Sequence, residues 1–189
     1  MSARASITGV ILAGGQGARM GGADKGWIEF EGRPLIERLL PQLVAQVDAV
    51  IISANRNTDR YSALSVPVVA DLRPDYVGPL AGIEAALAVC TTDWLLTCPV
   101  DTLSLPPDYA LRMLASAPAV AQRAGRMEPV FMLIPRAALD ALRAFLDSGE
   151  RKVGLWAQQQ DLTRVDFDDV PDAFGNLNDW QAMQQSQQQ

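Results

Sequence analysis

A short apolar run that breaks into glycines lies near the start of the chain and constrains its fold more than any other segment. Residues 7–12 read ITGVIL, and residues 13–25 then hold five glycines together with the cations Arg19 and Lys25. An apolar run ending in glycines is typical of a buried strand that leads into a loop. Glycines let successive main-chain N–H groups face an anion without a Cβ in the way. The sequence therefore predicts a polyphosphate site, most simply for a nucleoside triphosphate; a surface loop with incidental charges is the weaker alternative.

The spacing of this loop excludes two common phosphate-binding motifs. The dinucleotide pattern G-x-G-x-x-G, begun at Gly15, needs a glycine where Met20 stands. The Walker A pattern needs Gly-Lys-Ser/Thr, but Lys25 lies between Asp24 and Gly26. Neither a hydride-transfer enzyme nor a P-loop NTPase is the natural interpretation.

Length and charge restrict the organisation of the chain and its partners. With 189 residues, we expect one domain over residues 1–180, followed by a glutamine-rich, disordered tail at 181–189. The formal net charge of −6 disfavours nucleic acid and acidic lipid as partners. No apolar stretch approaches the roughly 20 residues of a membrane helix. An anionic ligand must therefore be attracted by local cations against the overall field.

Cysteine and histidine usage narrows the chemistry. Cys90 and Cys98 do not form a C-x-x-C pair, so we expect buried free thiols in a reducing cytoplasm. The chain has no histidine, which excludes histidine-based nucleophilic triads, histidine metal sites and an imidazole general base. We expect a cytoplasmic protein whose reaction needs none of these.

Strand and helix patterns alternate along the chain. Strands are expected at residues 7–12, 49–53, 66–70, 94–98, 119–122, 130–134 and 163–167. Helices are expected at residues 34–47, 79–90, 107–115, 136–146 and 152–160, and around Trp180. Pro41 is expected to kink or split the first helix. This alternation predicts an α/β fold in three layers, with a mixed but mostly parallel sheet and helices on both of its faces.

Ligands of such sheets bind where the strands end, which brings residues 12–25, residues 53–55, Asp71 and Asp101 to one rim. Asp101 ends an apolar strand and is a candidate ligand for Mg²⁺, which prefers oxygen donors; capping of the next helix is the alternative.

Lys25 and Arg19 are expected to neutralise the triphosphate and the departing pyrophosphate. Asp24 is expected to orient Lys25 through a local charge pair.

Recognition of the base needs a separate group of polar residues. A carboxylate accepts hydrogen bonds from N1–H and N2–H of guanine together, whereas cytosine has no matching pair of donors. Asp71 is the candidate carboxylate, and either Asn55 or Ser53 adds a further hydrogen bond. The alternative is that Asp71 begins the turn into Arg73 and that Asn55 caps a loop.

The motifs resemble those of the nucleotidyltransferases that activate sugars, polyols and cofactors, and among these the molybdenum cofactor guanylyltransferases most of all. The first signature, L-A-G-G-x-G-x-R-M-G-x-x-D-K at residues 12–25, is shared by several transferases. Further matching segments make the resemblance more specific and extend it over roughly residues 5 to 180. They lie at residues 52–56, Asp71, residues 78–82, residues 98–101, residues 129–131 and residues 176–178. The family often has asparagine where this chain has Ser53.

This resemblance implies a Rossmann-like nucleotidyltransferase fold and Mg²⁺-dependent transfer of GMP from GTP to the terminal phosphate of molybdopterin or Mo-molybdopterin, with release of pyrophosphate. It implies GTP binding by Leu12, Ala13, Gly14, Gly15, Lys25, Asn55, Asp71 and Asp101. It implies catalytic roles for Arg19, Lys25 and Asp101, with Asp101 as the metal ligand. Asn176 and Asn178 are implied in pterin binding, although Asn178 also suits a helix N-cap. A phosphate monoester is largely dianionic at neutral pH and needs no general base, which agrees with the lack of histidine.

Three other functions stay open from the sequence. They are a cytidylyltransferase for the same pterin, a sugar-phosphate nucleotidyltransferase, and a carrier that binds a nucleotide or cofactor without chemistry. Asp101 at the metal position argues against the carrier. As protein partners, the resemblance implies other cofactor-synthesis proteins and the molybdoenzymes that receive the product.

Overall fold

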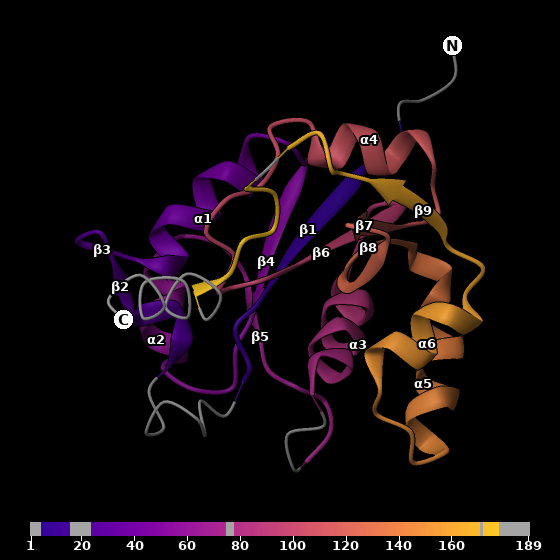
Figure 1. Cartoon of the computed structure of the whole chain (residues 1–189). Helices are drawn as coiled ribbons and strands as arrows, with labels where there is room; N and C mark the ends of the chain where they lie inside the picture. The colour runs from indigo at the N-terminus through magenta and orange to yellow at the C-terminus, as the bar shows by residue number, and fades with distance from the viewer. Residues whose placement is uncertain (1–4, 16–23, 75–77, 171, 178–189) are drawn as a thin grey trace, which may run out of the picture.

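The computed structural model describes residues 5–15, 24–74, 78–170 and 172–177, and within them a seven-stranded sheet forms the centre of the molecule (Figure 1). The strand order is β5-β4-β1-β6-β8-β7-β9. The strands of this sheet are β1 Ile7–Leu12, β4 Ala49–Ser53, β5 Val68–Val69, β6 Trp94–Pro99, β7 Ala119–Arg123, β8 Arg126–Pro135 and β9 Thr163–Asp166. A separate small hairpin joins β2 Glu29–Phe30 and β3 Arg33–Pro34.

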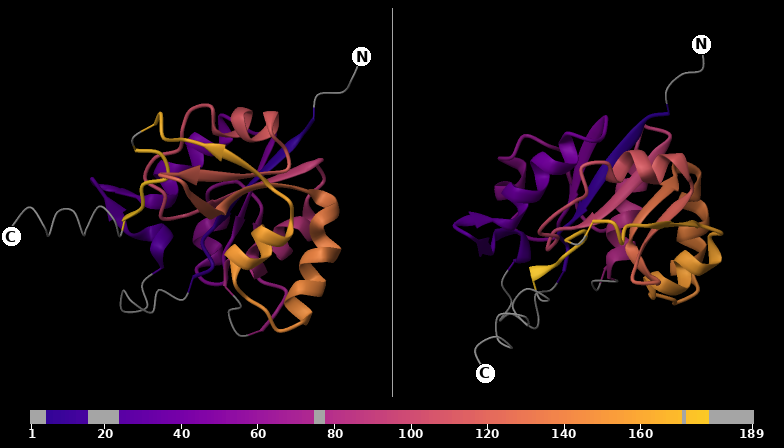
Figure 2. Two further views of the ribbon diagram at one scale, coloured as in Figure 1. Left: turned by 45° about the vertical axis from the view of Figure 1, so that its right-hand side comes forward. Right: turned by 45° about the horizontal axis from the view of Figure 1, so that its top comes forward.

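The helices cover both faces of this sheet. They are α1 Leu35–Val44, α2 Thr58–Ser62, α3 Pro79–Val89, α4 Tyr109–Ala115, α5 Leu139–Asp147 and α6 Val153–Gln159, with 3₁₀ turns at Lys25–Trp27 and Arg136–Ala138. In both views of Figure 2 the indigo part of the chain, with α1, and the orange helices α5 and α6 lie on opposite sides of the molecule. The predicted α/β fold in three layers is confirmed.

Strand directions follow from the connections between strands. β1 pairs in parallel with β4 and β6, and β4 with β5, because helical crossovers return the chain to the same end of the sheet. β7 and β8 are antiparallel because Ala124 and Gly125, both at positive φ, join them in a two-residue turn. β8 is also antiparallel to β6, so the sheet is mixed, as predicted.

The period of two along β1 explains why both faces of the sheet are buried. Ile7 and Ile11 pack in the cluster formed with α1 and α4. Val10 and Leu12 point the other way, into the cluster formed with α3, α5 and α6. A central strand that is apolar on both faces therefore needs a helical layer on each side.

Some of the secondary structure differs from the expectation: the β2–β3 hairpin was not predicted, and β8 begins at Arg126 rather than at residue 130. Helix α1 runs through Pro41 without a split. Pro41 is exposed, so the backbone hydrogen bond that it removes lies on the solvent side, while Leu39 and Leu43 keep the buried stripe continuous. The short helix α2, Thr58–Ser62, was not predicted, because its five residues carry no periodic apolar pattern.

Some expectations fall outside the described residues. The helix around Trp180 and the tail at 181–189 are among them, and the assignment of residues 1–180 to one domain stays a prediction. No helix in the described part of the chain combines the length and apolar character needed to cross a membrane.

The space around Gly9 and Gly154 differs, so alanine substitutions at these two glycines should have opposite effects on stability. A Cβ at Gly9 would lie 2.8 Å from Cδ2 of Leu43, which is fully buried, so Gly9→Ala should lower the free energy of unfolding by about 1–3 kcal/mol. A Cβ at Gly154 would meet only Pro129, at 4.0 Å, so Gly154→Ala in α6 should raise it by about 0.5–1 kcal/mol. Denaturant titrations measure both values. A Gly9→Ala protein as stable as the wild type would contradict this packing.

Candidate active site

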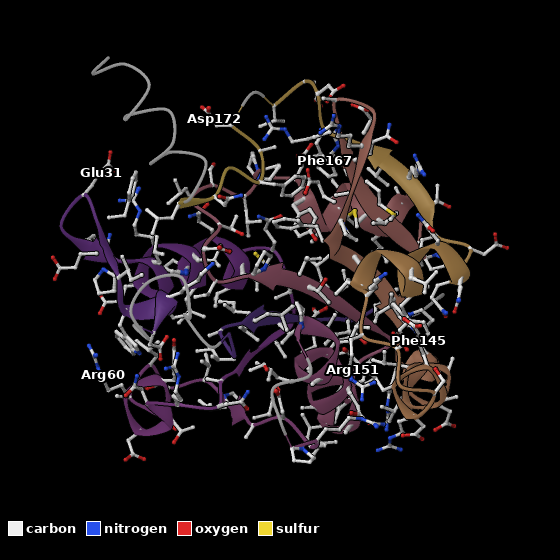
Figure 3. All side chains as sticks on the ribbon, turned by 60° about the horizontal axis from the view of Figure 1, so that its bottom comes forward. Glu31, Arg60, Phe145, Arg151, Phe167 and Asp172 are labelled. Atoms are coloured by element: carbon white, nitrogen blue, oxygen red, sulfur yellow. The ribbon has the colours of Figure 1, made fainter. Side chains whose placement is uncertain are left out.

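A pocket of about 420 Å³ opens where β1, β4 and β6 end. Figure 3 turns this lower edge of Figure 1 toward the reader. The pocket is lined by Leu12, Ala13, Gly14, Gly15, Lys25, Ser53, Asp71, Gly78, Pro79, Gly82, Pro99, Val100, Asp101 and Val130. The residues that the sequence assigned to one rim are thus brought together, with Asn55 directly behind them. Arg19 lies outside the described residues.

The carbonyl groups of the glycine loop are held on the side of β4. The guanidinium of Arg56 donates to the carbonyl of Gly15 at 3.0 Å, and Nδ2 of Asn55 lies 3.5 Å from the carbonyl of Gly14. In a trans peptide the C=O and the next N–H point in opposite directions, so the N–H of Gly15 is directed away from β4. The sequence analysis gave Arg56 no role, yet this residue fixes the carbonyl of Gly15, the last described residue of the loop before Asp24.

A close ion pair joins the two predicted catalytic side chains. Nζ of Lys25 lies 2.9 Å from Oδ2 of Asp101, and the two side chains are 31% and 16% exposed. Lys25 belongs to the 3₁₀ turn Lys25–Trp27, and Asp101 to the turn that follows β6. The alternative that Asp101 caps the next helix is wrong, because α4 begins only at Tyr109, with Asp108 as its N-cap.

The expected charge pair between Asp24 and Lys25 is not formed. The carboxylate of Asp24 instead accepts hydrogen bonds from the Gly26 N–H at 3.1 Å, from Nδ2 of Asn57 at 2.9 Å and from the Tyr61 hydroxyl at 2.6 Å. Burial raises the pKa of Tyr61, and its bond to Asp24 raises it further, so the hydroxyl remains a donor. Asp24 therefore anchors the turn Lys25–Trp27, and the Lys25 ammonium forms its ion pair with Asp101 instead.

The turn at Asp101 is supported by the last described segment of the chain. The N–H of Leu177 donates to the carbonyl of Asp101 at 3.1 Å, and the N–H of Leu103 donates to that of Gly175 at 2.8 Å. Between them, Thr102 and Asn176 form an antiparallel bridge. Asn176 thus lies beside the Asp101 turn. Its role in pterin binding stays a prediction, and Asn178 lies outside the described residues.

Asp71 lines the pocket and Asn55 lies behind it. Nδ2 of Asn55 donates to Oδ2 of Asp71 at 2.8 Å, and the Asp71 N–H donates to Oδ1 of Asn55, also at 2.8 Å. Burial raises the pKa of Asp71; the bond from Asn55 partly offsets this rise, and the Glu84 carboxylate adds to it. Asn55 orients Asp71 in this arrangement, and its direct contact with a base stays a prediction.

Ser53 differs from Asn55 in that it lines the pocket itself. Its hydroxyl oxygen is buried and has no hydrogen-bond partner in the described part of the structure. A Cβ at Gly82 would lie 2.5 Å from this oxygen, so a glycine is needed where α3 passes Ser53. Of the two alternatives for a further base contact, Ser53 has the unsatisfied group at the pocket wall.

A charge network around the buried Glu84, which the sequence analysis missed, fixes the segment after Asp71. Nε and Nη2 of Arg73 donate to the two carboxylate oxygens of Glu84, at 2.7 and 3.1 Å, and Nη1 donates to Asp147 at 2.7 Å. The Glu84 side chain is only 4% exposed, and Nε of Arg143 lies 3.6 Å from it. A lone glutamate in the apolar, alanine-rich α3 was the sequence signal. The network ties the segment that carries Asp71 to α3 and α5.

The residues at the pocket fit a metal that arrives with a nucleotide. The described residues contain no group of three or more side chains that would form a metal site of their own. Mg²⁺ commonly binds through one or two carboxylates together with substrate phosphates. A single carboxylate, Asp101, next to a glycine loop suits that arrangement.

This chain is similar in sequence to one protein family over most of its length. A family model described as "MobA-like NTP transferase domain" matches residues 9–162. The "Molybdenum cofactor guanylyltransferase" of Cupriavidus metallidurans is 44% identical over an alignment that covers 94% of this chain and 93% of that protein. The protein of the same name from Shewanella halifaxensis is 41% identical, over 96% and 94% of the two chains.

Solved structures share the fold. The "Molybdopterin-guanine dinucleotide biosynthesis protein A" of Archaeoglobus fulgidus superposes with a TM-score of 0.70 at 23% identity, over 90% of this chain and 92% of that chain. A nucleotidyl transferase of Methanothermobacter (Mth528) gives a TM-score of 0.69 at 22% identity, over 94% and 95%.

The Arg73–Glu84 network predicts a stability pattern. Arg73→Met should lower the free energy of unfolding by about 3 kcal/mol, because it leaves the buried Glu84 carboxylate poorly compensated. Adding Glu84→Met should recover most of this loss. Asp147 is 68% exposed, so Asp147→Asn should cost less than about 1 kcal/mol. Denaturant unfolding of the four proteins measures these values, and equal losses for Arg73→Met and Asp147→Asn would contradict the buried network.

Proposed function

Because the chain belongs to the family of MobA-like NTP transferase domains, we propose that it transfers GMP from GTP to the terminal phosphate of molybdopterin, or of Mo-molybdopterin, and releases pyrophosphate. The observation that carries this proposal is the convergence of Lys25, Asp71 and Asp101 on one pocket. Relatives with the name guanylyltransferase, 44% and 41% identical over nearly the whole chain, support the choice of reaction.

The base end of the pocket favours guanine. The Asp71 carboxylate accepts N1–H and N2–H of guanine side by side, in the orientation that Asn55 gives it. The unsatisfied Ser53 hydroxyl provides a further hydrogen bond at the pocket wall. Cytosine offers no matching pair of donors to Asp71, which disfavours a cytidylyltransferase.

The phosphate end of the pocket combines main-chain donors with charge. The glycine loop presents N–H groups, and Lys25 and Arg19 neutralise the triphosphate and the charge on the departing pyrophosphate. Asp101 holds Mg²⁺, which when bound neutralises charge on the phosphate oxygens. Phosphate oxygens would share the Lys25 ammonium with Asp101, with which it pairs in the structure.

The acceptor needs positioning more than activation. Its terminal phosphate is largely dianionic at neutral pH and is already a nucleophile, so no general base is required. Asn176, which lies beside the Asp101 turn, and Asn178 bind the pterin, and rate enhancement comes from in-line placement and charge neutralisation. The reaction takes place in the cytoplasm, in exchange with cofactor-synthesis proteins and recipient molybdoenzymes. The thiols of Cys90 and Cys98, buried and unpaired in the described structure, suit that compartment.

Pyrophosphate release with molybdopterin, Mg²⁺ and each of GTP, CTP, ATP and UTP tests the proposal. We expect turnover with GTP, and about a 100-fold loss of turnover in Asp101→Asn. Asp140→Asn, at a side chain that is 95% exposed and remote from the pocket, is the matched control and should keep wild-type turnover. Preference for CTP would reject the guanine proposal, and GTP binding without turnover would favour a carrier. Unchanged turnover of Asp101→Asn over a range of Mg²⁺ would remove Asp101 from the reaction.

The raised pKa of Asp71 predicts that guanine binding releases protons at acidic pH. Only the ionised carboxylate accepts both guanine donors, so GTP affinity should fall as the pH drops through a pKa above the ordinary 3.8 of aspartate. Calorimetry in two buffers of different ionisation enthalpy measures the protons released. The γ-phosphate of GTP titrates equally in both proteins, so wild type should release more protons than Asp71→Asn. Equal release would contradict this protonation linkage.

A further inference from the structure

The residue directly before Lys25 is enclosed by hydrogen-bond donors. Oδ1 of Asp24 accepts from the Tyr61 hydroxyl and the Gly26 N–H, and Oδ2 accepts from Nδ2 of Asn57. Along the chain, Asp24 is the carboxylate nearest to Lys25, so an ion pair between these two residues would be expected. Because these donors occupy Asp24, the Lys25 ammonium pairs with Asp101, which is far away in the sequence.

The donors come from a unit built around α2. Tyr61 is fully buried, and its ring lies 5.1 Å from that of Trp27, in the same turn as Lys25. A Cβ at Gly26 would lie 2.3 Å from the Tyr61 hydroxyl, so only glycine lets the turn come this close. The guanidinium of Arg60, at the lower left in Figure 3, lies 3.9 Å from the Trp27 ring.

Asn57 completes the unit at the start of α2. Its φ of 50° is left-handed, a conformation that asparagine adopts more readily than most residues. This backbone places its side-chain amide on the second oxygen of Asp24. Both oxygens of Asp24 are thereby tied to α2, and the position of the Lys25 turn depends on that helix.

We propose that Tyr61 and Asn57 are positioning residues for Lys25, acting through Asp24. They hold the 3₁₀ turn on α2 and occupy the Asp24 carboxylate, so that the ammonium faces Asp101 and the phosphates of the nucleotide. In this proposal Lys25 contacts the phosphates that react, whereas Tyr61 and Asn57 do not. The catalytic part of this inference rests on the proposed function; the orientation of Lys25 does not.

The chain offers a direct readout of the Lys25 environment, because Lys25 and Lys152 are its two lysines. Protein labelled with ¹³C at lysine Cε gives one NMR signal for each, and Lys25→Gln identifies them. In Tyr61→Phe, which keeps the ring, and in Asn57→Gly, which keeps the left-handed backbone, the Lys25 signal should move toward that of the exposed Lys152. Tyr109→Phe is the matched control, because it removes the hydroxyl of another fully buried tyrosine, which donates to the Thr97 carbonyl. It should leave the Lys25 signal unchanged.

Turnover gives the second readout. Tyr61→Phe should lower kcat/KM for GTP on the order of tenfold to a hundredfold, as displacement of a catalytic group does. In a Lys25→Gln background it should cause no further loss, whereas a merely structural role would lower turnover equally in both backgrounds. An unchanged Lys25 signal in both Tyr61→Phe and Asn57→Gly, or equal losses in the two backgrounds, would overturn the proposal. If the wild type releases no pyrophosphate while the Lys25 signal still responds, the proposed function fails and the orientation of Lys25 by Tyr61 and Asn57 stands.

Discussion

The parallel register of β1 with its two neighbours is the constraint on which the site depends. Leu12 lies opposite Ser53 on β4 and opposite Pro99 on β6, so the strands end at the same level. Each strand then passes a functional segment to the pocket: the glycine loop, the Ser53–Asn55 segment and the Asp101 turn. A shift of this register would turn apolar side chains toward the wrong layer, so the core that stabilises the sheet also fixes the spacing of the site.

Charge in this acidic protein is arranged locally. Asp71 and Asp101 line the pocket together with Lys25, while the whole chain carries a formal charge of −6. Each carboxylate suits a different kind of donor: Asp71 lies beside the amide of Asn55, and Asp101 beside an ammonium. The two ends of the pocket therefore differ in chemistry, as the proposed binding of a base at one end and of phosphates at the other requires.

The sequence predicted what periodicity and strand ends determine, and missed what depends on packing between distant segments. Asp71 and Asp101 were placed on one rim because each follows an apolar strand. The partner of Asp24 was predicted wrongly, because neighbours along the chain suggested Lys25. One of its actual partners, Tyr61, belongs to a five-residue helix without an apolar pattern, and another, Asn57, directly precedes that helix. Likewise, Glu84 is a lone charge in α3 that the sequence analysis did not single out, and only the fold shows that Arg73 is its partner.

The pairing of residues 175–177 with the Asp101 turn has a consequence for biosynthesis. The glycine loop and Asp101 are translated well before Gly175 and Leu177, which pair with the Asp101 turn. Until they emerge, the carbonyl of Asp101 and the N–H of Leu103 lack the partners that they have in the finished molecule. The Asp101 turn thus gains its last hydrogen bonds late in translation, and a chain terminated before residue 175 would carry the glycine loop beside a turn that lacks them.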